Sequence, residues 1–262
     1  MKHDSGAPRR LGGLSGVEAF ALCFTVMVVS VSATVLLLSD RLERTVRQDE
    51  PVAAVLAEKY GPGRFSENDE EWIIRDYFQD RRDGVFLDVG ANHYKHYSNT
   101  YFLETSLGWS GVAVDALTEF GDDYRLHRPK TRFVAMYASD VADSSVRFFV
   151  AENSLVSSSD PAFTKRYGAD GNPREVPTTT LNAVLDEAGI RTIDFLSMDI
   201  ELAEPKALAG FDVRRFRPAL VCIEAHPEVR QQILDYFATN GYTIVGKYLR
   251  LDSHNLYFRP LD

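Results

Sequence analysis

Cysteine is scarce in this sequence, with only Cys23 and Cys222 among 262 residues. Two cysteines cannot build a disulfide framework, and Cys23 lies inside an apolar run, so nothing indicates an oxidising compartment. An excess of basic residues is also absent, since 29 Lys and Arg stand against 38 Asp and Glu, a formal net charge of −9. A chain this acidic is a poor match for a phosphate backbone, and we expect no nucleic-acid partner.

Several sequence patterns are missing as well. We find no internal repeat, no long low-complexity stretch, no G-x-G-x-x-G turn of the dinucleotide-binding folds and no G-x-S-x-G nucleophile elbow. The composition is otherwise that of a globular protein, with 45% hydrophobic residues, 17 Gly and 11 Pro. Collagen-like and wholly disordered chains are therefore excluded, and the length suits one or two domains.

One apolar run stands out near the beginning of the chain. Residues 19–38 carry no charge, and a helix of this length rises ~30 Å, the thickness of the hydrocarbon layer of a bilayer. We predict a retained, single-pass transmembrane anchor after an N-terminal tail at 1–18. A cleaved signal peptide is the alternative, because Val31-Ser32-Ala33 resembles a cleavage site, but the apolar run continues beyond it. Three basic residues on each side leave the orientation undecided by charge.

The rest of the chain divides into a linker and one domain. Residues 39–64 are charged, then alanine-rich, and end in Gly61-Pro62-Gly63, which indicates a helical stalk and a turn. From residue 65 to 262 apolar runs alternate with helical patterns, which favours a mostly parallel sheet covered on both faces. The strands are expected at 85–89, 111–115, 132–137, 146–150, 193–198, 219–223, 242–249 and 256–258. The last two have only a short connection and must be antiparallel.

Polar residues follow the expected strands at the edge where α/β sheets bind their ligands. Asp88, Gly90, Ala91 and Asn92 end the first strand, and Asp115 and Ala116 end the second. An acidic side chain in the position of Asp115 accepts hydrogen bonds from ribose hydroxyls. Beyond the later strands lie Asp199, Glu201, Glu204, Glu224 and His226. Their common position predicts one site rather than separate surface charges.

These residues resemble a known family. The segment Gly84–Asn92 (GVFLDVGAN), Ser98-Asn99-Thr100 with Glu104, and Leu107-Gly108-Trp109-Ser110-Gly111 are similar to the N-terminal signature of FkbM-type methyltransferases. The segments 176–181, 193–204 and 221–226 are similar to the C-terminal signature. The resemblance covers about residues 65–260 and consists of several motifs in the right order.

The resemblance implies a fold, a cofactor and roles for residues. The fold would be the Rossmann-like class I methyltransferase fold, with seven strands of which the last is antiparallel. The cofactor would be S-adenosylmethionine, with methyl transfer usually to a hydroxyl. Asp88, Gly90, Ala91 and Asn92 would hold its amino-acid end, Asp115 with Ala116 its ribose, and Ala138, Ser139 and Asp140 would lie near the adenine. The acidic positions that face the acceptor would be Asp199, Glu201, Glu204 and Glu224.

Two positions depart from the family pattern. The segment His93–Tyr97 lacks a glycine that the family carries after the asparagine, and Leu202 replaces the glycine of Asp-x-Glu-Gly-x-Glu. A non-catalytic, membrane-anchored relative acting as a scaffold is therefore one alternative. Another nucleotide-binding α/β enzyme acting on sugar nucleotides is the second, against which the missing G-x-G-x-x-G stands.

For the reaction we expect a base that removes the hydroxyl proton, either a carboxylate such as Asp199 or His226, which is neutral near physiological pH. The catalytic residues would be Asp199, Glu201, Glu224 and His226. We expect no dedicated metal site, although Mg²⁺ held by Asp199 and Glu224 is a possible variation. His93 and His96 are more suited to the mouth of the cofactor site than to a metal.

The sequence thus predicts a membrane-tethered O-methyltransferase. Because lipid-linked glycans are assembled at membranes, we expect a hydroxyl of a sugar, glycolipid or polysaccharide intermediate as acceptor. The methyl donor is cytosolic, so the catalytic domain is expected on the cytoplasmic side.

Overall fold

The computed structural model describes residues 52–168 and 173–261. The predicted membrane anchor at 19–38 lies outside these residues. Within the two described ranges, no helix is both long and apolar enough to cross a bilayer. Residues 52–60 are helical, and Leu56 and Tyr60 in this stretch pack against Trp72 of the following domain.

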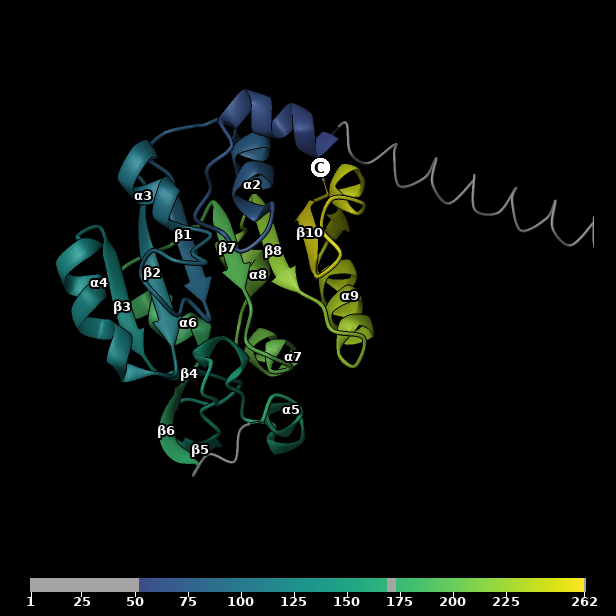
Figure 1. Ribbon diagram of the computed structural model, residues 1–262. Helices are drawn as coiled ribbons and strands as arrows, with labels where there is room; N and C mark the ends of the chain where they lie inside the picture. The colour runs from purple at the N-terminus through teal and green to yellow at the C-terminus, as the bar shows by residue number, and fades with distance from the viewer. Residues whose placement is uncertain (1–51, 169–172, 262) are drawn as a thin grey trace, which may run out of the picture. The chain divides into compact units, whose positions relative to one another are not determined.

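A seven-stranded sheet forms the centre of the domain (Figure 1). Its strand order is β3-β2-β1-β7-β8-β10-β9. The strands are β1 (Val85–Val89), β2 (Ser110–Asp115), β3 (Thr131–Ala135), β7 (Phe195–Met198), β8 (Leu220–Glu224), β9 (Tyr242–Ile244) and β10 (Asn255–Pro260). The last strand, β10, is antiparallel to both β8 and β9, whereas β3, β2, β1, β7 and β8 pair in parallel. The predicted sheet of seven mostly parallel strands with an antiparallel last strand is confirmed.

The helices cover both faces of this sheet. They are α2 (Glu70–Phe78), α3 (Tyr101–Leu107), α4 (Gly121–His127), α5 (Pro161–Arg166), α6 (Leu181–Glu187), α7 (Glu204–Ala209), α8 (Val213–Phe216) and α9 (Arg230–Thr239), with 3₁₀ turns η1 (Thr118–Phe120), η2 (Ser154–Val156) and η3 (Gly246–Tyr248). Phe86 of β1 packs on the side of α2 and α3, while Leu87 and Val89 pack on the side of α6, α7 and α9. This alternation is why β1 is apolar at nearly every position: a central parallel strand is buried on both faces.

Short polar side chains set several helix beginnings. The Thr180 hydroxyl accepts a hydrogen bond from the Ala183 amide at α6, and the Asp160 carboxylate accepts from the amides of Ala162 and Phe163 at α5. Such caps satisfy amides that the first helical turn leaves without partners. At the other end of α3, Gly108 takes a φ of 79°, a left-handed conformation that glycine adopts without strain.

A second, smaller sheet was not foreseen from the sequence. It consists of β4 (Tyr137–Ala138), β6 (Arg174–Thr179) and β5 (Ser145–Phe148), in the order β4-β6-β5. The expected strand at 132–137 is therefore wrong as a single element, because the chain leaves the large sheet after Ala135 and resumes as β4. The expected strand at 242–249 is also too long, since β9 ends at Ile244 and η3 follows.

Candidate active site

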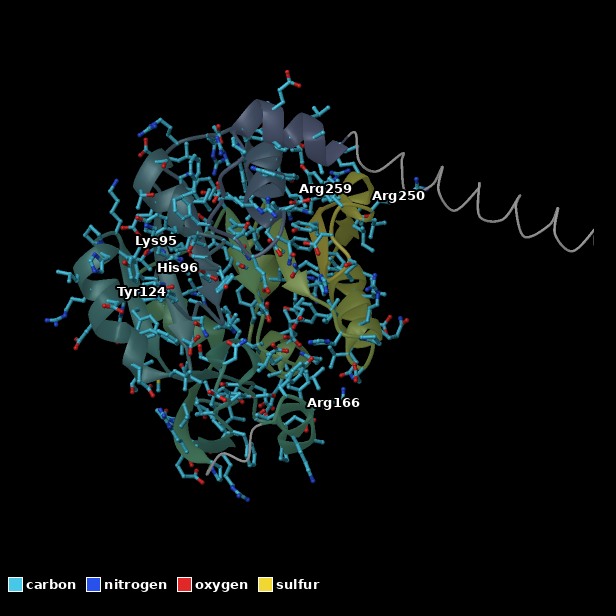
Figure 2. All side chains as sticks on the ribbon, viewed as in Figure 1. Lys95, His96, Tyr124, Arg166, Arg250 and Arg259 are labelled. Atoms are coloured by element: carbon cyan, nitrogen blue, oxygen red, sulfur yellow. The ribbon has the colours of Figure 1, made fainter. Side chains whose placement is uncertain are left out.

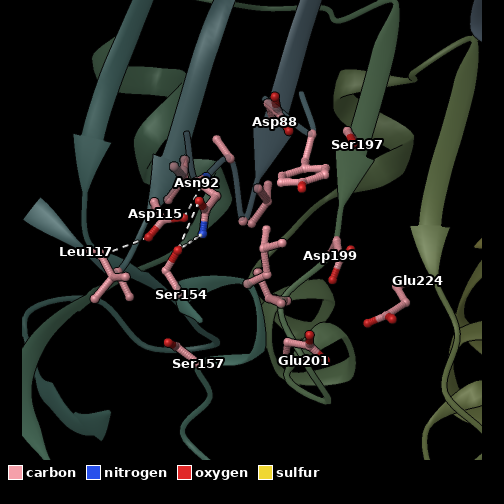
Figure 3. A pocket seen from close by; sticks show the side chains of 18 of the residues that line it. Asp88, Asn92, Asp115, Leu117, Ser154, Ser157, Ser197, Asp199, Glu201 and Glu224 are labelled. Carbon is pink, nitrogen blue, oxygen red and sulfur yellow. Dashed lines mark hydrogen bonds between the residues drawn. The ribbon is translucent and has the colours of Figure 1, made fainter. Parts of the chain in front are cut away.

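A large pocket opens at the carboxyl ends of β1 and β7, where the strand order reverses (Figure 3). This is the place at which open α/β sheets bind ligands. The space inside the pocket and its mouth is about 1300 Å³. Of the residues proposed for the site, the structure brings the following to its lining: Asp88, Gly90, Ala91, Asn92, Asp115, Ala116, Asp199, Glu201 and Glu224.

The turn after β1 forms one side of the pocket. Gly90 has a φ of +82° and Asn92 a φ of 46°, so both lie in the left-handed region. A β-carbon at Gly90 would stand 1.7 Å from the carbonyl oxygen of Asp199. Glycine is thus required by the neighbouring β7 turn, and not only by the approach of a ligand as the sequence suggested. The close contact fixes the two strand ends relative to one another.

Asp88 lies at the base of the pocket. Its carboxylate is buried and its Oδ2 accepts a hydrogen bond of 2.7 Å from the Thr100 hydroxyl. Burial raises the pKa of Asp88, and the bond from Thr100 acts in the opposite direction. Beside it, the Asn99 side-chain amide donates to the Ser197 hydroxyl at 3.0 Å. The polar motif Ser98-Asn99-Thr100 therefore supports the end of β1.

Asp115 ends β2 and is held by two main-chain amides. Its Oδ2 accepts from the Asn92 amide and its Oδ1 from the Leu117 amide, both at 2.8 Å. Burial raises the pKa of Asp115 to about 6, and these two hydrogen bonds only partly offset it. Each carboxylate oxygen keeps a second lone pair, so the group can accept further hydrogen bonds from a ligand.

Small and medium apolar side chains form the wall next to Asp115. They are Ala116, Leu117, Met136, Ala138, Leu155 and Val156. Such a wall suits a flat ring system. Ser139 and Asp140, which the resemblance placed near an adenine, are not among the lining residues within the described part of the chain. The Ser139 side chain is buried and its hydroxyl donates to Asp140 at 3.0 Å, whereas Ala138, expected near the adenine with them, does line the pocket.

Most of the glycine-free segment after Asn92 folds away from the pocket, although Tyr97 at its end belongs to the lining. The Tyr94 ring stacks on the rings of His127, at 4.5 Å, and His93, at 4.6 Å. The His93 Nδ1 accepts the amides of Lys95 and His96, both at 3.1 Å, and so closes a tight turn. Lys95 and His96 can be followed in Figure 2. Tyr94 is not among the described lining residues, so its ring leaves the cofactor side open.

A loop missed by the sequence analysis covers the pocket. It carries η2, and Asn153, Ser154 and Ser157 line the cavity. The side-chain Nδ2 of Asn92 lies 3.1 Å from the Ser154 hydroxyl and donates to it, while the same hydroxyl lies 3.3 Å from Asn92 Oδ1, to which it can donate. This pair ties the covering loop to the β1 turn. The sequence offered only a polar stretch after an apolar run as a signal, which is typical of any surface loop.

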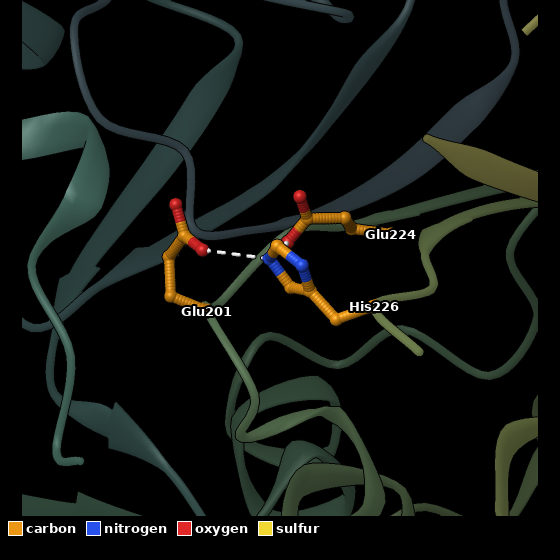
Figure 4. Close-up of side chains that lie close together, drawn as sticks. All are labelled: Glu201, Glu224 and His226. Atoms are coloured by element: carbon orange, nitrogen blue, oxygen red, sulfur yellow. Dashed lines mark hydrogen bonds and ion pairs between the residues drawn. The ribbon is translucent and has the colours of Figure 1, made fainter. Parts of the chain in front are cut away.

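Acidic residues and an imidazole gather on the side of β7 and β8. The His226 Nε2 lies 3.0 Å from Glu201 Oε2 and 3.1 Å from Glu224 Oε2 (Figure 4). His226 is not among the described lining residues and stands behind the two glutamates. Burial lowers the pKa of His226, so the ring is neutral at pH 7.

Four carboxylates in this group repel one another. Burial, and then the neighbouring charge of Asp199, raise the pKa of Glu201 to about 9. Burial likewise raises the pKa of Glu204 to about 7. Asp199 and Glu224 are directly coupled, and the pKa of each is raised by burial first and by like charges second. Within the ranges that the structure describes, none of the four forms an ion pair with a Lys or Arg.

The loop that carries Glu201 has a strained backbone. Glu201 and Leu202 have φ values of 54° and 75°, which L-residues adopt at a cost of about 1–2 kcal/mol each. Two contacts hold the loop: the Ser158 hydroxyl donates to the Glu201 carbonyl at 2.7 Å, and Glu204 accepts the Ile200 amide at 2.9 Å. Leu202 thus holds a left-handed conformation at the position where the family pattern has glycine.

All the charged side chains that line the pocket, among the described residues, are acidic. Its lining contains Glu67, Glu70, Asp88, Asp115, Asp199, Glu201 and Glu224, and no Lys or Arg among the described residues. Such a surface attracts a cation and opposes a pyrophosphate. The sequence analysis had not singled out Glu67 or Glu70, because neither follows a strand of the sheet.

A comparison with protein families decides the class. The model of the methyltransferase FkbM domain matches residues 88–244, more than half of the chain. The chain belongs to the FkbM methyltransferase family. Its methyl donor is S-adenosylmethionine, as the resemblance implied. No curated protein matches the chain.

Solved structures with some likeness to this FkbM methyltransferase include a 1,6-didemethyltoxoflavin-N1-methyltransferase from Burkholderia thailandensis, bound to its substrate and S-adenosylhomocysteine. It is 15% identical with a TM-score of 0.38, covering 98% of this chain and 95% of that chain. A TehB-like methyltransferase from Corynebacterium glutamicum is 14% identical with a TM-score of 0.43, covering 82% and 98%. These values are low, and the assignment rests on the family match.

The site of this FkbM methyltransferase fits the cofactor chemically. Asp115 offers carboxylate oxygens for ribose hydroxyls, the apolar wall beside it suits the base, and Asp88 lies where a cationic amino group would be neutralised. The acidic lining also suits a positively charged sulfonium.

Proposed function

We propose that this protein is an O-methyltransferase that methylates a hydroxyl of a sugar, glycolipid or polysaccharide intermediate at a membrane surface. The observation that carries the proposal is the group formed by Asp199, Glu201, Glu224 and His226 across the pocket from Asp115. A hydroxyl loses its proton when it is methylated, and these groups supply acceptors for that proton.

The bound cofactor supplies an electrophilic methyl carbon whose leaving thioether needs no proton. The protein must then hold the acceptor oxygen about 3 Å from that carbon and in line with the bond that breaks. Asp199 is open to the pocket and orients the hydroxyl by accepting its hydrogen bond. Glu201, whose pKa is raised to about 9, already carries a proton at pH 7 and bonds the neutral His226 ring, so the hydroxyl proton passes to the Asp199 carboxylate.

The charge of the pocket favours a neutral acceptor. The described lining holds seven carboxyl groups, of which Glu201 and Glu224 keep their protons at pH 7, and no Lys or Arg. The pyrophosphate of a nucleotide sugar would therefore find no cationic partner there and would meet the carboxylates that are ionised. The same argument speaks against the alternative of a dinucleotide-dependent enzyme on sugar nucleotides. Neutral glycans and glycolipids are the acceptors that this surface tolerates.

The membrane part of the proposal rests on the uncharged run at 19–38. We propose that it anchors the enzyme and that the catalytic domain lies on the cytoplasmic side, where the methyl donor is made. Protease protection in intact cells tests this arrangement. A C-terminal domain digested from outside the cell would contradict it.

Replacement of Asp199 by asparagine tests the chemistry. We expect Asp199→Asn to lower methyl transfer from tritiated S-adenosylmethionine to neutral glycolipids by about 10²–10⁴-fold. The dissociation constant of S-adenosylhomocysteine should change less than about threefold, because Asp115 and Asp88 carry that contact. Asp186→Asn, an exposed carboxylate paired with Arg215, is the matched control. Unchanged turnover in Asp199→Asn would remove this residue from the mechanism.

A further inference from the structure

Two sets of ligand atoms meet at Glu224. One oxygen of Asp199, Glu204 and Glu224 each lies within 4.8 Å of the others, and the same holds for Glu201, Glu224 and His226. Glu224 belongs to both sets. The ligands come from the β7–α7 loop and from the end of β8, so the folded sheet edge brings them together.

Glu204 has a buried carboxylate oxygen that no hydrogen bond within the described chain satisfies. Its side chain has no exposed surface. One oxygen, Oε1, accepts the Ile200 amide at 2.9 Å, while Oε2 is buried without any partner. A buried carboxylate oxygen without a donor is costly, and structures rarely leave one unsatisfied. The orphaned oxygen lies beside the carboxyl groups of Asp199 and Glu224.

No side chain of the described chain supplies the missing positive charge. The four carboxylates form no ion pair with Lys or Arg, and the nearest basic ring, His226, faces Glu201 and Glu224. Oxygen ligands of this kind are those preferred by Mg²⁺ and by Mn²⁺. Asp199 is open to the pocket, which leaves room for a ligand on that side.

We propose that Asp199, Glu204 and Glu224 bind one divalent cation of the Mg²⁺ or Mn²⁺ class, and that Glu201 and His226 position Glu224 for it. The role of this ion rests on the proposed O-methyl transfer: an acceptor hydroxyl that reaches the pocket side of the ion becomes more acidic and gives up its proton more readily. The binding site itself does not depend on that reaction.

Binding of Mn²⁺ to the full chain tests the proposal, because its paramagnetic resonance signal reports free ion directly. We expect one Mn²⁺ per chain, displaced by Mg²⁺, and a higher Tm in its presence. Glu204→Gln should weaken Mn²⁺ binding by at least about 100-fold. Loss of a residue that only hydrogen-bonds a metal ligand typically costs less than this. This variant keeps Oε1 for the Ile200 amide and removes a buried charge, so it should fold.

The control is Glu228→Gln. Glu228 is an exposed carboxylate paired at 3.1 Å with Arg166, which Figure 2 labels, and its loss should leave Mn²⁺ binding unchanged. S-adenosylhomocysteine binding, measured in parallel, shows that each variant is folded. A folded wild-type chain that binds no Mn²⁺ at millimolar concentration, or Glu204→Gln that binds as well as wild type, overturns the cation site. Absence of methyl transfer in a chain that binds the ion would instead overturn the proposed function.

Discussion

Asp115 shows how a single carboxylate is prepared for a ligand. Two main-chain amides hold its oxygens at 2.8 Å, while burial raises its pKa to about 6. Because this pKa lies above the 3.8 of an unperturbed aspartate, the folded chain keeps the proton to a higher pH than the unfolded chain does. Ionisation of Asp115 therefore costs the folded state free energy, and the free energy of unfolding falls as pH rises from about 4 to about 6. A ligand that donates hydrogen bonds to the ionised carboxylate recovers part of that loss.

We expect the affinity for S-adenosylhomocysteine to increase about tenfold between pH 5 and pH 7.5, as Asp115 ionises and gains acceptor capacity. Titration calorimetry at a series of pH values measures this. Asp115→Asn should bind more weakly and lose most of this pH dependence. Glu119→Gln, an exposed neighbour paired with Arg174, should keep the wild-type profile. Equal pH profiles for Asp115→Asn and wild type would show that Asp115 is not the titrating group.

At this scale the sequence predicted the residues that end strands. Asp88, Asp115, Asp199 and Glu224 reach the pocket because a parallel sheet places all its carboxyl ends on one edge. It did not predict Ser154 or Glu67, which come from loops whose path depends on tertiary packing. His226 was identified, but its place behind Glu201 and Glu224 follows from side-chain geometry that no sequence spacing specifies.

At the scale of elements, the ends of β1 and β7 depend on one close contact. Main chain meets main chain at Gly90 and Asp199, since an added β-carbon would lie 1.7 Å from the Asp199 carbonyl oxygen. The Asp199 amide also donates to the Val89 carbonyl at 2.9 Å. Both sides of the pocket are thereby built on the same pair of strands, and a shift of one strand end moves both the cofactor side and the acceptor side.

Gly90→Ala should therefore destabilise the fold by more than about 2 kcal/mol, since it combines backbone strain with a steric clash. Binding of S-adenosylhomocysteine should also be lost. Urea denaturation gives the first quantity and calorimetry the second. Gly189→Ala is the matched control, because Gly189 has a similar φ of +70° but nothing within 4 Å of an added β-carbon. It should cost only about 1–2 kcal/mol. Similar losses in the two variants would mean that the contact with Asp199 is unimportant.

The order of strands and helices was predictable because their apolar patterns are strong. Phe86 and Leu87, for example, pack on opposite faces of the sheet, and a strand buried on both sides has an unbroken apolar sequence. The small sheet of β4, β5 and β6 was not predictable. β4 contains only Tyr137 and Ala138, and its separation from β3 at Met136 is decided by pairing with β6, about forty residues away.

At the scale of the whole molecule, charge is the dominant property. The net charge of −9 is accompanied by seven acidic residues in the pocket lining. S-adenosylmethionine carries one more positive charge than S-adenosylhomocysteine, so the field of the protein favours the donor over the product. Salt weakens interactions of this range.

Raising the ionic strength from about 0.01 M to about 0.5 M should thus lower the affinity for S-adenosylmethionine several-fold more than that for S-adenosylhomocysteine. Competitive calorimetry at the two salt concentrations measures the ratio. A ratio that does not change would show that the acidic lining is protonated or neutralised when the donor binds.

The strained backbone of Leu202 affects how many further substitutions this fold can tolerate. Glycine adopts the backbone at this position freely, whereas leucine costs about 1–2 kcal/mol there. Natural proteins hold only about 5–15 kcal/mol in reserve. The strain at Leu202 is therefore a sizeable fraction of the free energy of unfolding of an ordinary domain, and it leaves less room for further destabilising substitutions.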